Sequence, residues 1–215
     1  MEARGRFITL EGSEGVGKST NIAVIADTLR LLGIDCVTTR EPGGTPFAEE
    51  IRQLLLSVRA EPVSPNAELL LMFAARAQHL SELIEPALAR GLWVVSDRFT
   101  DATFAYQGGG RGMNTAVIEQ LERIVQGSLR PDLTLYLDLD PEVAANRLAD
   151  RERDRFELES RPFFARVRNA YLERARSAER YRIIDASESL EVVGQNIRAV
   201  IERFVQQSRA GSSAS

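Results

Sequence analysis

The chain has 215 residues, 44% of them hydrophobic and 27% charged, the balance of a globular protein in water. A single cysteine and a single histidine exclude an internal disulfide and a zinc cluster, and the net charge of −4 argues against a general nucleic-acid binder. No apolar run approaches the roughly 18 residues of a membrane span, and residues 1–6 lack a signal-peptide pattern, so we expect a cytoplasmic protein.

Short apolar runs alternate with stretches of helical spacing along the chain. In chain order the patterns predict a strand at 7–11, a helix at 18–32, a strand at 35–39, helices at 46–56 and 65–90, a strand at 92–96, a helix at 115–127, a strand at 133–139, helices at 141–150 and 160–179, a strand at 181–185 and a helix at 189–207. Pro86 predicts a kink or restart in the long helix. The alternation indicates βαβ units, so we expect an α/β fold with a five-stranded parallel sheet flanked by helices.

We expect one domain over residues 1–208, because no linker or repeat divides the chain. Residues 209–215 are mostly small and polar, which predicts a disordered tail. The run around 147–159 is too charged for a core and is predicted to be a short lid or an exposed helix.

The strongest local signal is residues 12–19, GSEGVGKS, which fit the P-loop pattern G-x-x-x-x-G-K-[ST]. A predicted strand enters the loop and a predicted helix leaves it, as this phosphate cradle requires. Lys18, the only lysine in the chain, would reach the β- and γ-phosphates, and the Ser19 hydroxyl would join a magnesium ion. The predicted ATP-binding residues are Gly12, Ser13, Glu14, Gly15, Val16, Gly17, Lys18, Ser19 and Thr20. The sequence thus predicts a P-loop NTPase that uses ATP and Mg²⁺.

Other nucleotide motifs are missing from the sequence. No N-K-x-D or D-x-x-G motif occurs, which disfavours a GTPase. The glycine run at 108–112 is not G-x-G-x-x-G, because Met113 stands at the third glycine position.

Three arginines could hold a second anion opposite the P-loop. Arg40 and Arg98 follow predicted strands, and ligands of open α/β sheets bind at the carboxyl ends of the strands. Arg76 lies on an otherwise apolar helical stretch. A guanidinium binds phosphate through paired hydrogen bonds and so fixes its orientation.

Two acids nearby have open roles. Asp97 closes a predicted strand and could orient the hydration shell of Mg²⁺ or pair with Arg98. Glu14 lies inside the P-loop and could hold metal or a sugar hydroxyl, or face solvent.

The charged run has two interpretations: a solvated face, or a lid whose arginine neutralises the transferring phosphoryl group. The P-loop carries no arginine at its variable positions, which favours the lid. The catalytic candidates are therefore Lys18 and Arg98 with the lid arginines Arg151, Arg153 and Arg155.

Together these segments closely resemble thymidylate kinases (dTMP kinases) of the bacterial type, from residue 7 to about 204. The resemblance rests on motifs in the same order: the P-loop with Glu14, TREPGGT at 39–45, FAAR at 73–76, DRF at 97–99, AYQG at 105–108, PDLTLYLD at 131–138 and IDA at 184–186.

The resemblance implies a nucleoside monophosphate kinase that transfers a phosphoryl group from ATP to dTMP, with Mg²⁺, as a homodimer that binds neither nucleic acid nor membrane. Metal would be held at Ser19 and Asp97. The implied dTMP-binding residues are Glu14, Arg40, Pro42, Met72, Phe73, Arg76, Arg98, Thr103, Tyr106 and Gln107. The sequence departs from the family at Met72, where an aromatic residue is usual, and at Ala102, where serine is usual.

Two alternatives to dTMP phosphorylation stay open at this point. One is a P-loop switch or ATP-gated binding module that phosphorylates no small molecule. The other is a kinase of the same fold with a different small acceptor. ATP consumption that depends on an added nucleoside monophosphate would indicate a nucleoside monophosphate kinase and not a switch or binding module.

Overall fold

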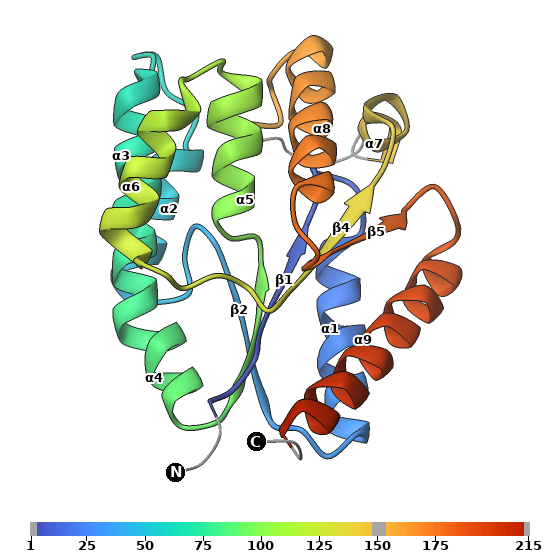
Figure 1. Ribbon diagram of the computed structural model, residues 1–215. Coiled ribbons are helices and arrows are strands. Elements are labelled where there is room, and N and C mark those ends of the chain that lie inside the picture. Colours follow the sequence, from blue (N-terminus) through green and yellow to red (C-terminus); the bar gives the residue numbers. More distant parts are fainter. Residues whose placement is uncertain (1–3, 148–153, 213–215) are drawn as a thin grey trace.

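The computed structural model describes residues 4–147 and 154–212, and within them a parallel sheet (Figure 1). Its strands are β1 (Phe7–Glu11), β2 (Cys36–Arg40), β3 (Trp93–Asp97), β4 (Leu133–Asp138) and β5 (Tyr181–Asp185), in the order β2-β3-β1-β4-β5. Every neighbouring pair is parallel. The predicted α/β class with a five-stranded parallel sheet is confirmed.

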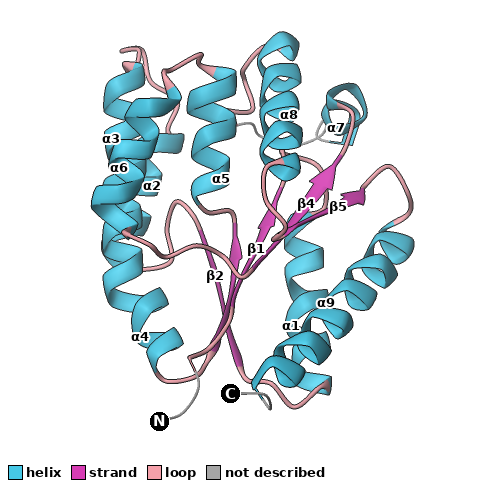
Figure 2. Ribbon diagram, viewed as in Figure 1, coloured by secondary structure: helices cyan, strands magenta, loops and turns pink. Residues whose placement is uncertain are grey.

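Helices cover both faces of the sheet (Figure 2). One face carries α1 (Lys18–Leu31) and α9 (Leu190–Ser212). The rest of the helical structure comprises α2 (Pro46–Leu56), α3 (Pro65–His79), the π-helical turn η1 (Leu80–Ile84), α4 (Glu85–Ala89), α5 (Thr100–Thr103), the π-helical segment η2 (Phe104–Gly110), α6 (Thr115–Gln126), α7 (Pro141–Arg147) and α8 (Arg161–Arg176). No helix among the described residues combines the length and apolarity that a membrane crossing needs.

The central strand β1 shows why the site forms at one edge of the sheet. Its side chains alternate, so Ile8 and Leu10 enter the apolar core beneath α1 and α9. On the opposite face Phe7 packs into a second apolar cluster near the amino end. Further along that same face the fully buried residues are Thr9 and Glu11. The carboxyl end of β1 therefore places polar groups inside the protein, directly before the P-loop.

The long helix predicted at 65–90 is interrupted, as Pro86 indicated. The interruption is the π-helical turn η1, which lies immediately before α4. Because proline lacks an N–H, Pro86 cannot donate the regular i to i−4 hydrogen bond, and the widened turn sits where that bond would fall.

Residues 100–110 form the helical pair α5 and η2, which the sequence patterns did not predict. Three consecutive glycines, at 108–110, disfavour a helix when only propensity is considered. Packing explains them: a Cβ on Gly109 would lie 2.6 Å from the Ala170 Cβ and 3.0 Å from the Arg166 carbonyl oxygen. The glycines let η2 approach α8 closely, so tertiary contact outweighs propensity.

The disordered tail predicted from Arg209 is wrong for residues 209–212, because α9 continues to Ser212. The Arg209 guanidinium donates to the Leu32 carbonyl oxygen at 2.7 Å. No proline occurs within α9, and alanine at position 210 favours a helix, so the small residues there are compatible with it.

The predicted lid is described only in part. Arg151 and Arg153 lie outside the described residues. Residues 154–159 form turns that are not the exposed segment the charge pattern suggested, since Phe156 is 5% exposed and Glu157 is 8% exposed. The Asp154 carboxylate accepts from the backbone N–H groups of both residues, at 2.8 and 3.0 Å, and closes this turn.

We predict that Gly109→Ala lowers the free energy of unfolding by about 1–3 kcal/mol, because the added methyl group overpacks the contact with α8. The matched control is Gly194→Ala on α9, whose Cβ would meet Val24 at an ordinary 3.7 Å. This control should be neutral or stabilising by up to about 1 kcal/mol, as alanine favours a helix. Urea unfolding of both variants makes the measurement, and equal effects would contradict the packing explanation.

Candidate active site

A cavity of about 540 Å³ opens at the carboxyl ends of the strands, a volume suited to a small-molecule ligand. The predicted site residues among its lining are Glu14, Gly15, Gly17, Lys18, Ser19, Thr20, Arg40, Pro42, Met72, Arg76, Asp97, Arg98, Thr103, Tyr106 and Gln107. Residues from β1 to η2, far apart in the sequence, thus meet around one space.

The P-loop conformation depends on its glycines. Gly12, Gly15 and Gly17 have φ of 146°, 75° and 87°, values that disfavour any residue with a side chain. Gly12 is also close-packed, because a Cβ there would lie 2.9 Å from the Leu137 carbonyl oxygen. Gly17 is the N-cap of α1, so the loop delivers free backbone N–H groups at a helix N-terminus, where anions are stabilised.

Lys18 is held inside this loop. Its ammonium donates to the Ser13 carbonyl oxygen at 2.6 Å and lies 3.9 Å from a Glu14 carboxylate oxygen. Only 6% of the residue is exposed. Burial, and then the nearby Arg98 charge, lower the pKa of Lys18. An incoming phosphate would add negative charge beside the ammonium and so stabilise its charged form.

Arg98 has an unusual backbone conformation, with φ of 68° in a non-glycine residue. The Ser96 hydroxyl donates to the Arg98 carbonyl oxygen at 2.7 Å, and the Arg98 N–H donates to Leu10 at 2.9 Å. This turn points the guanidinium toward the P-loop, where it donates to Glu14 at 2.5 Å. The strained turn after β3 therefore places the Arg98 guanidinium beside the P-loop.

Glu11 anchors the residue after that turn. Its Oε1 accepts from the Phe99 N–H at 2.7 Å, and its Oε2 accepts from the Tyr171 hydroxyl at 2.9 Å. Burial, followed by the nearby Asp101 carboxylate, raises the pKa of Glu11 to about 8. Glu11 is thus a neutral carboxylic acid at pH 7 that links β1, the Arg98 turn and α8.

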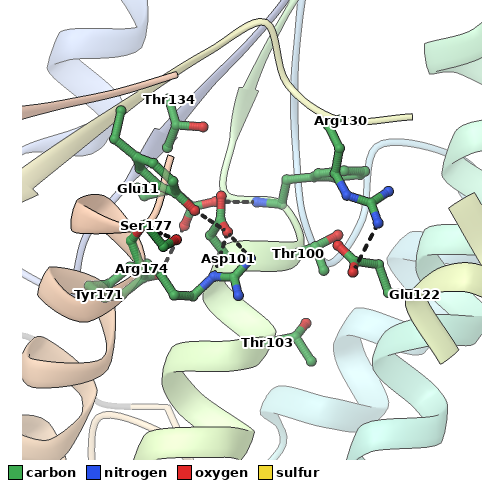
Figure 3. Close-up of polar contacts among 12 residues, drawn as sticks. Glu11, Thr100, Asp101, Thr103, Glu122, Arg130, Thr134, Tyr171, Arg174 and Ser177 are labelled. Carbon is green, nitrogen blue, oxygen red and sulfur yellow. Dashed lines mark hydrogen bonds and ion pairs between the residues drawn. The ribbon is translucent and has the colours of Figure 1, made fainter. Parts of the chain in front are cut away.

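Figure 3 draws Asp101 close to Glu11 and Arg174. The pKa of Asp101 shifts in the opposite direction to that of Glu11. The Asp101 carboxylate accepts from Arg174 at 2.7 Å and from Arg180 at 2.8 and 3.0 Å. Burial alone would raise the pKa of Asp101, but the two guanidinium groups outweigh it and the pKa lies below its ordinary value. This ion cluster ties α5 to α8 and to the start of β5.

Arg76 reaches the cavity from α3 and is 3% exposed. Its Nε donates to Glu41 at 2.7 Å and its Nη2 donates to Thr103 at 3.0 Å. The His79 ring nitrogen Nδ1 lies 3.0 Å from the second Glu41 oxygen. Burial raises the pKa of Glu41, but Arg76 and His79 outweigh that effect and the pKa is lowered. The Nη1 atom of Arg76 is buried and has no hydrogen-bond partner in the part of the chain that the structure describes.

Two further arginines come from β2 and α2. Arg40 pairs with Glu49, at 3.2 and 2.9 Å, and its side chain is 54% exposed. Arg52 donates to the Pro42 carbonyl oxygen at 2.9 Å and has no carboxylate partner among the described residues. Burial, then Arg40 and Arg98, lower the pKa of Arg52. This wall of the cavity therefore has an excess of positive charge.

Among the described residues, the predicted P-loop residues Gly12, Ser13 and Val16 do not line the cavity, and neither do Phe73 and Arg155. Phe73 is 2% exposed and packs in the core with Leu69, whereas its neighbour Met72 lines the cavity. Arg155 contacts Glu68 at 2.7 Å and the Leu55 carbonyl oxygen at 2.8 Å, below the cavity surface.

Asp97 lines the cavity beside the P-loop. It lies 4.0 Å from the Arg98 guanidinium, so the Asp–Arg pair that the sequence allowed is at the limit of contact. Its Oδ1 is buried and accepts no hydrogen bond from residues 4–147 or 154–212.

The fold and the site define a class. A parallel sheet with a P-loop after its central strand, and a cationic cavity facing that loop, are the structure of a P-loop kinase of the nucleoside monophosphate kinase class. The family profile described as thymidylate kinase matches residues 10–197. The chain belongs to the thymidylate kinase family.

Individual relatives agree with this assignment. The chain is 61% identical to the thymidylate kinase of Chromohalobacter salexigens over 209 residues, and 57% identical to that of Pseudomonas putida over 207 residues. Each alignment covers 95% of this chain and 99% of the relative. The crystal structure of thymidylate kinase from Ehrlichia chaffeensis superposes with a TM-score of 0.74 at 31% identity, covering 92% of this chain and 99% of the other.

Sequence reasoning missed several residues that shape the site: Glu11, Arg52, Glu68 and Asp101. A charged residue that ends an apolar strand, such as Glu11, was a signal that could have been used. Arg52 stands one turn after the buried Ala48 on α2, so helical spacing also pointed inward. Asp101 and Glu68 have no such local signal, because their partners come from distant segments.

We predict that Glu11→Gln changes how stability depends on pH. The folded protein keeps the Glu11 proton up to about pH 8, whereas the unfolded chain releases it near 4.5. The stabilising contribution of this carboxyl is therefore complete below pH 4.5 and is lost as the pH rises through 8. Glutamine keeps a similar shape but cannot ionise, so between pH 5 and 8 the variant should gain about 4 kcal/mol relative to wild type.

Urea unfolding at both pH values tests this difference. Glu119→Gln, an exposed substitution on α6, should change stability by less than about 0.5 kcal/mol at either pH. Parallel pH profiles for wild type and Glu11→Gln would show that the buried carboxyl does not hold its proton.

Proposed function

We propose that this thymidylate kinase family member phosphorylates dTMP with ATP in the described cavity. The observation that carries the proposal is the excess of cationic groups on facing walls. Lys18 lies in the P-loop, Arg98 follows β3, and Arg52 has no carboxylate partner among the described residues. Such a site suits two phosphate-bearing ligands brought end to end.

The reaction needs no covalent enzyme intermediate. An oxygen of the dTMP phosphate attacks the γ-phosphorus of ATP, the new P–O bond forms, and the bond to the β-phosphate oxygen breaks to release ADP and dTDP. Lys18 and the loop N–H groups would hold the ATP phosphates, while Arg98 and Arg52 hold the acceptor phosphate. Catalysis then consists of alignment and charge neutralisation.

Arg76 and Gln107, which we call the base floor of the cavity, could form hydrogen bonds with the edge of the base. Arg76 Nη1 is a buried donor without a partner, which fits the O4 acceptor of thymine. Gln107 lines the cavity nearby and its amide oxygen could accept from the base N3–H. Cytosine has an amino donor and an unprotonated N3 at these positions, so both contacts would be lost. Met72 would pack on the base through its sulfur-bearing side chain.

The sugar would lie between the base floor and the P-loop. Tyr106 is 6% exposed and its ring lies 5.7 Å from the Arg98 guanidinium carbon. It would crowd a 2′-hydroxyl, while Glu14 would meet the 3′-hydroxyl. Thr103, Pro42 and Arg40 would complete the acceptor side of the cavity.

The residues beside the P-loop fit a magnesium ion. The buried Asp97 Oδ1 has no hydrogen-bond partner within the described structure, and the exposed Ser19 hydroxyl lines the same cavity. Hard oxygen donors of this kind suit Mg²⁺, which commonly takes one or two protein ligands together with substrate phosphates. Bound there, the ion would neutralise charge on the transferring phosphates.

The remaining positive charge on the transferring phosphoryl group's side would come from the end of α7 and the segment after it. Arg147 lines the cavity directly. Arg151 and Arg153, which lie outside the described residues, stay proposed catalytic groups. Arg155 is better placed as a structural contact of Glu68.

We also propose a homodimer in the cytoplasm. α3 packs beside α2 and α6, and it is not wholly inside the core: Leu70 is 57% exposed, as are Leu54 at 50% and Val117 at 43%. These three side chains give the three helices an apolar surface that a second copy could cover.

A coupled ADP-release assay tests the function, with ATP and Mg²⁺ against dTMP, dUMP, UMP, dCMP, AMP and GMP. We expect turnover to be highest with dTMP and to require Mg²⁺. Turnover with another acceptor would keep the kinase and refute the dTMP assignment. ATP binding without acceptor-dependent turnover would favour a nucleotide-gated binding module.

We predict that Arg52→Gln raises KM for dTMP by about 10- to 100-fold, because one charge-assisted hydrogen bond to phosphate is lost. KM for ATP should change by less than about twofold. Arg59→Gln is the matched control, since Arg59 is exposed beyond the end of α2 and should leave both constants unchanged. An unchanged dTMP KM in Arg52→Gln would remove Arg52 from the acceptor site.

We predict a solution mass of about twice 23.9 kDa from sedimentation equilibrium. Leu70→Glu should shift the protein toward monomer, because a charge would enter the apolar surface. Glu50→Gln on the exposed side of α2 is the control. A wild-type monomer at micromolar concentration would refute the dimer.

A further inference from the structure

We propose that Glu68 is a positioning residue that sets base selectivity by fixing the orientation of the Gln107 amide. The inference rests on the proposed function, in which Gln107 faces the base. Glu68 begins the inward face of α3, is 1% exposed and does not line the cavity. It would therefore act on the acceptor only through Gln107.

The contacts of Glu68 are numerous for one buried carboxylate. Its Oε1 accepts from Gln107 Nε2 at 2.8 Å and from Arg111 Nε at 3.2 Å. Its Oε2 contacts Arg111 Nη2 at 3.1 Å and Arg155 Nη1 at 2.7 Å. Burial raises the pKa of Glu68, but Arg111, Gln107 and Arg155 outweigh it and the pKa lies below its ordinary value. The carboxylate is therefore ionised at neutral pH and can only accept hydrogen bonds.

An ionised neighbour removes the usual ambiguity of a glutamine side chain. A Gln amide can rotate by 180° and exchange its oxygen with its nitrogen at little cost when its neighbours tolerate both. Next to Glu68 the rotated amide would place its oxygen against a carboxylate, leaving two acceptors without a proton between them. Gln107 must therefore direct Nε2 to Glu68 and keep its oxygen for the cavity.

This orientation determines which base is accepted. A carbonyl oxygen can accept the N3–H of thymine or uracil, whereas it repels the unprotonated N3 of cytosine. A free amide could turn its NH₂ group to the cavity and would accept cytosine instead. Glu68 thus fixes the Gln107 amide so that it presents only a hydrogen-bond acceptor to the cavity.

The same carboxylate also connects the base floor with residues 154–159. Arg155 binds Glu68 directly, and Arg111 bridges Glu68 to Glu159. The two arginines keep Glu68 charged inside the protein, and this charge is what orients Gln107. Substitutions in this segment that leave the contacts of Glu68 with Arg155 and Arg111 intact should have little effect on selectivity.

The test is Glu68→Gln, assayed for kcat/KM with dTMP and dCMP. A glutamine at 68 can offer either an oxygen or an NH₂ group, so the Gln107 amide is released. We expect the dTMP to dCMP ratio to fall by about tenfold or more, through loss with dTMP and gain with dCMP. A merely structural role would lower both kcat/KM values together and leave the ratio unchanged.

Two companion variants isolate the mechanism. Glu159→Gln removes the other carboxylate from Arg111 without touching Gln107 and should leave the ratio within about twofold of wild type. In a Gln107→Ala background, Glu68→Gln should have no further effect on the ratio, because the residue it acts through is gone. A full effect of Glu68→Gln in that background would overturn the proposal.

The outcomes also separate this proposal from the proposed function. If wild type does not prefer dTMP to dCMP, the base assignment itself fails. If wild type does prefer dTMP and folded Glu68→Gln keeps the wild-type ratio, only the role of Glu68 fails. Should Glu68→Gln not fold, Glu68→Asp withdraws the carboxylate by one methylene and should lower the ratio at least about threefold; an unchanged ratio would overturn the proposal.

Discussion

The hydrogen bond from the Phe99 N–H to the Glu11 carboxyl is the contact on which the site depends. Glu11 is the last residue of β1 before the P-loop, and Phe99 directly follows the strained turn at Arg98. The same carboxyl accepts from Tyr171, so α8 is fixed to the same point. One buried acid therefore sets the distance between the phosphate loop of β1, the cation from β3 and the helical wall.

Buried carboxyl groups of this protein differ in charge according to their neighbours. Glu11 has no paired guanidinium among the described residues and keeps its proton, whereas Glu41, Glu68 and Asp101 each contact arginine and have lowered pKa values. The ionised acids orient groups that donate, and the neutral acid avoids the large cost of an unpaired buried charge. The arginines paired with Asp101 are held as structural contacts, whereas Lys18 and Arg52 line the cavity.

The sheet and the P-loop could be predicted because their signals are local: apolar runs, glycine positions and helical spacing. The resemblance also placed Met72, Arg76 and Gln107 at the cavity, as the structure does. The helical pair at residues 100–110 could not be predicted, since its glycines are explained only by contact with α8. Glu68 and Asp101 were missed for the same reason, because burial and partners from distant segments give each of them its role, whereas Glu11 had a local signal that was not used. The exact register of α3, which turns Phe73 into the core, likewise depends on tertiary packing.

Because Lys18 is the sole lysine of the chain, a lysine-directed reaction can modify only the P-loop among the side chains. Every other side-chain cation is arginine, so an amine-directed reagent meets only the chain's α-amino group and the Nζ of Lys18. A protease specific for lysine has one peptide bond to cut, after residue 18. That bond lies in the first turn of α1, and the Lys18 side chain that the protease must recognise is buried. Covalent labelling or cleavage of this protein therefore reports on one loop, and intact mass alone is enough to follow its opening or its protection by nucleotide.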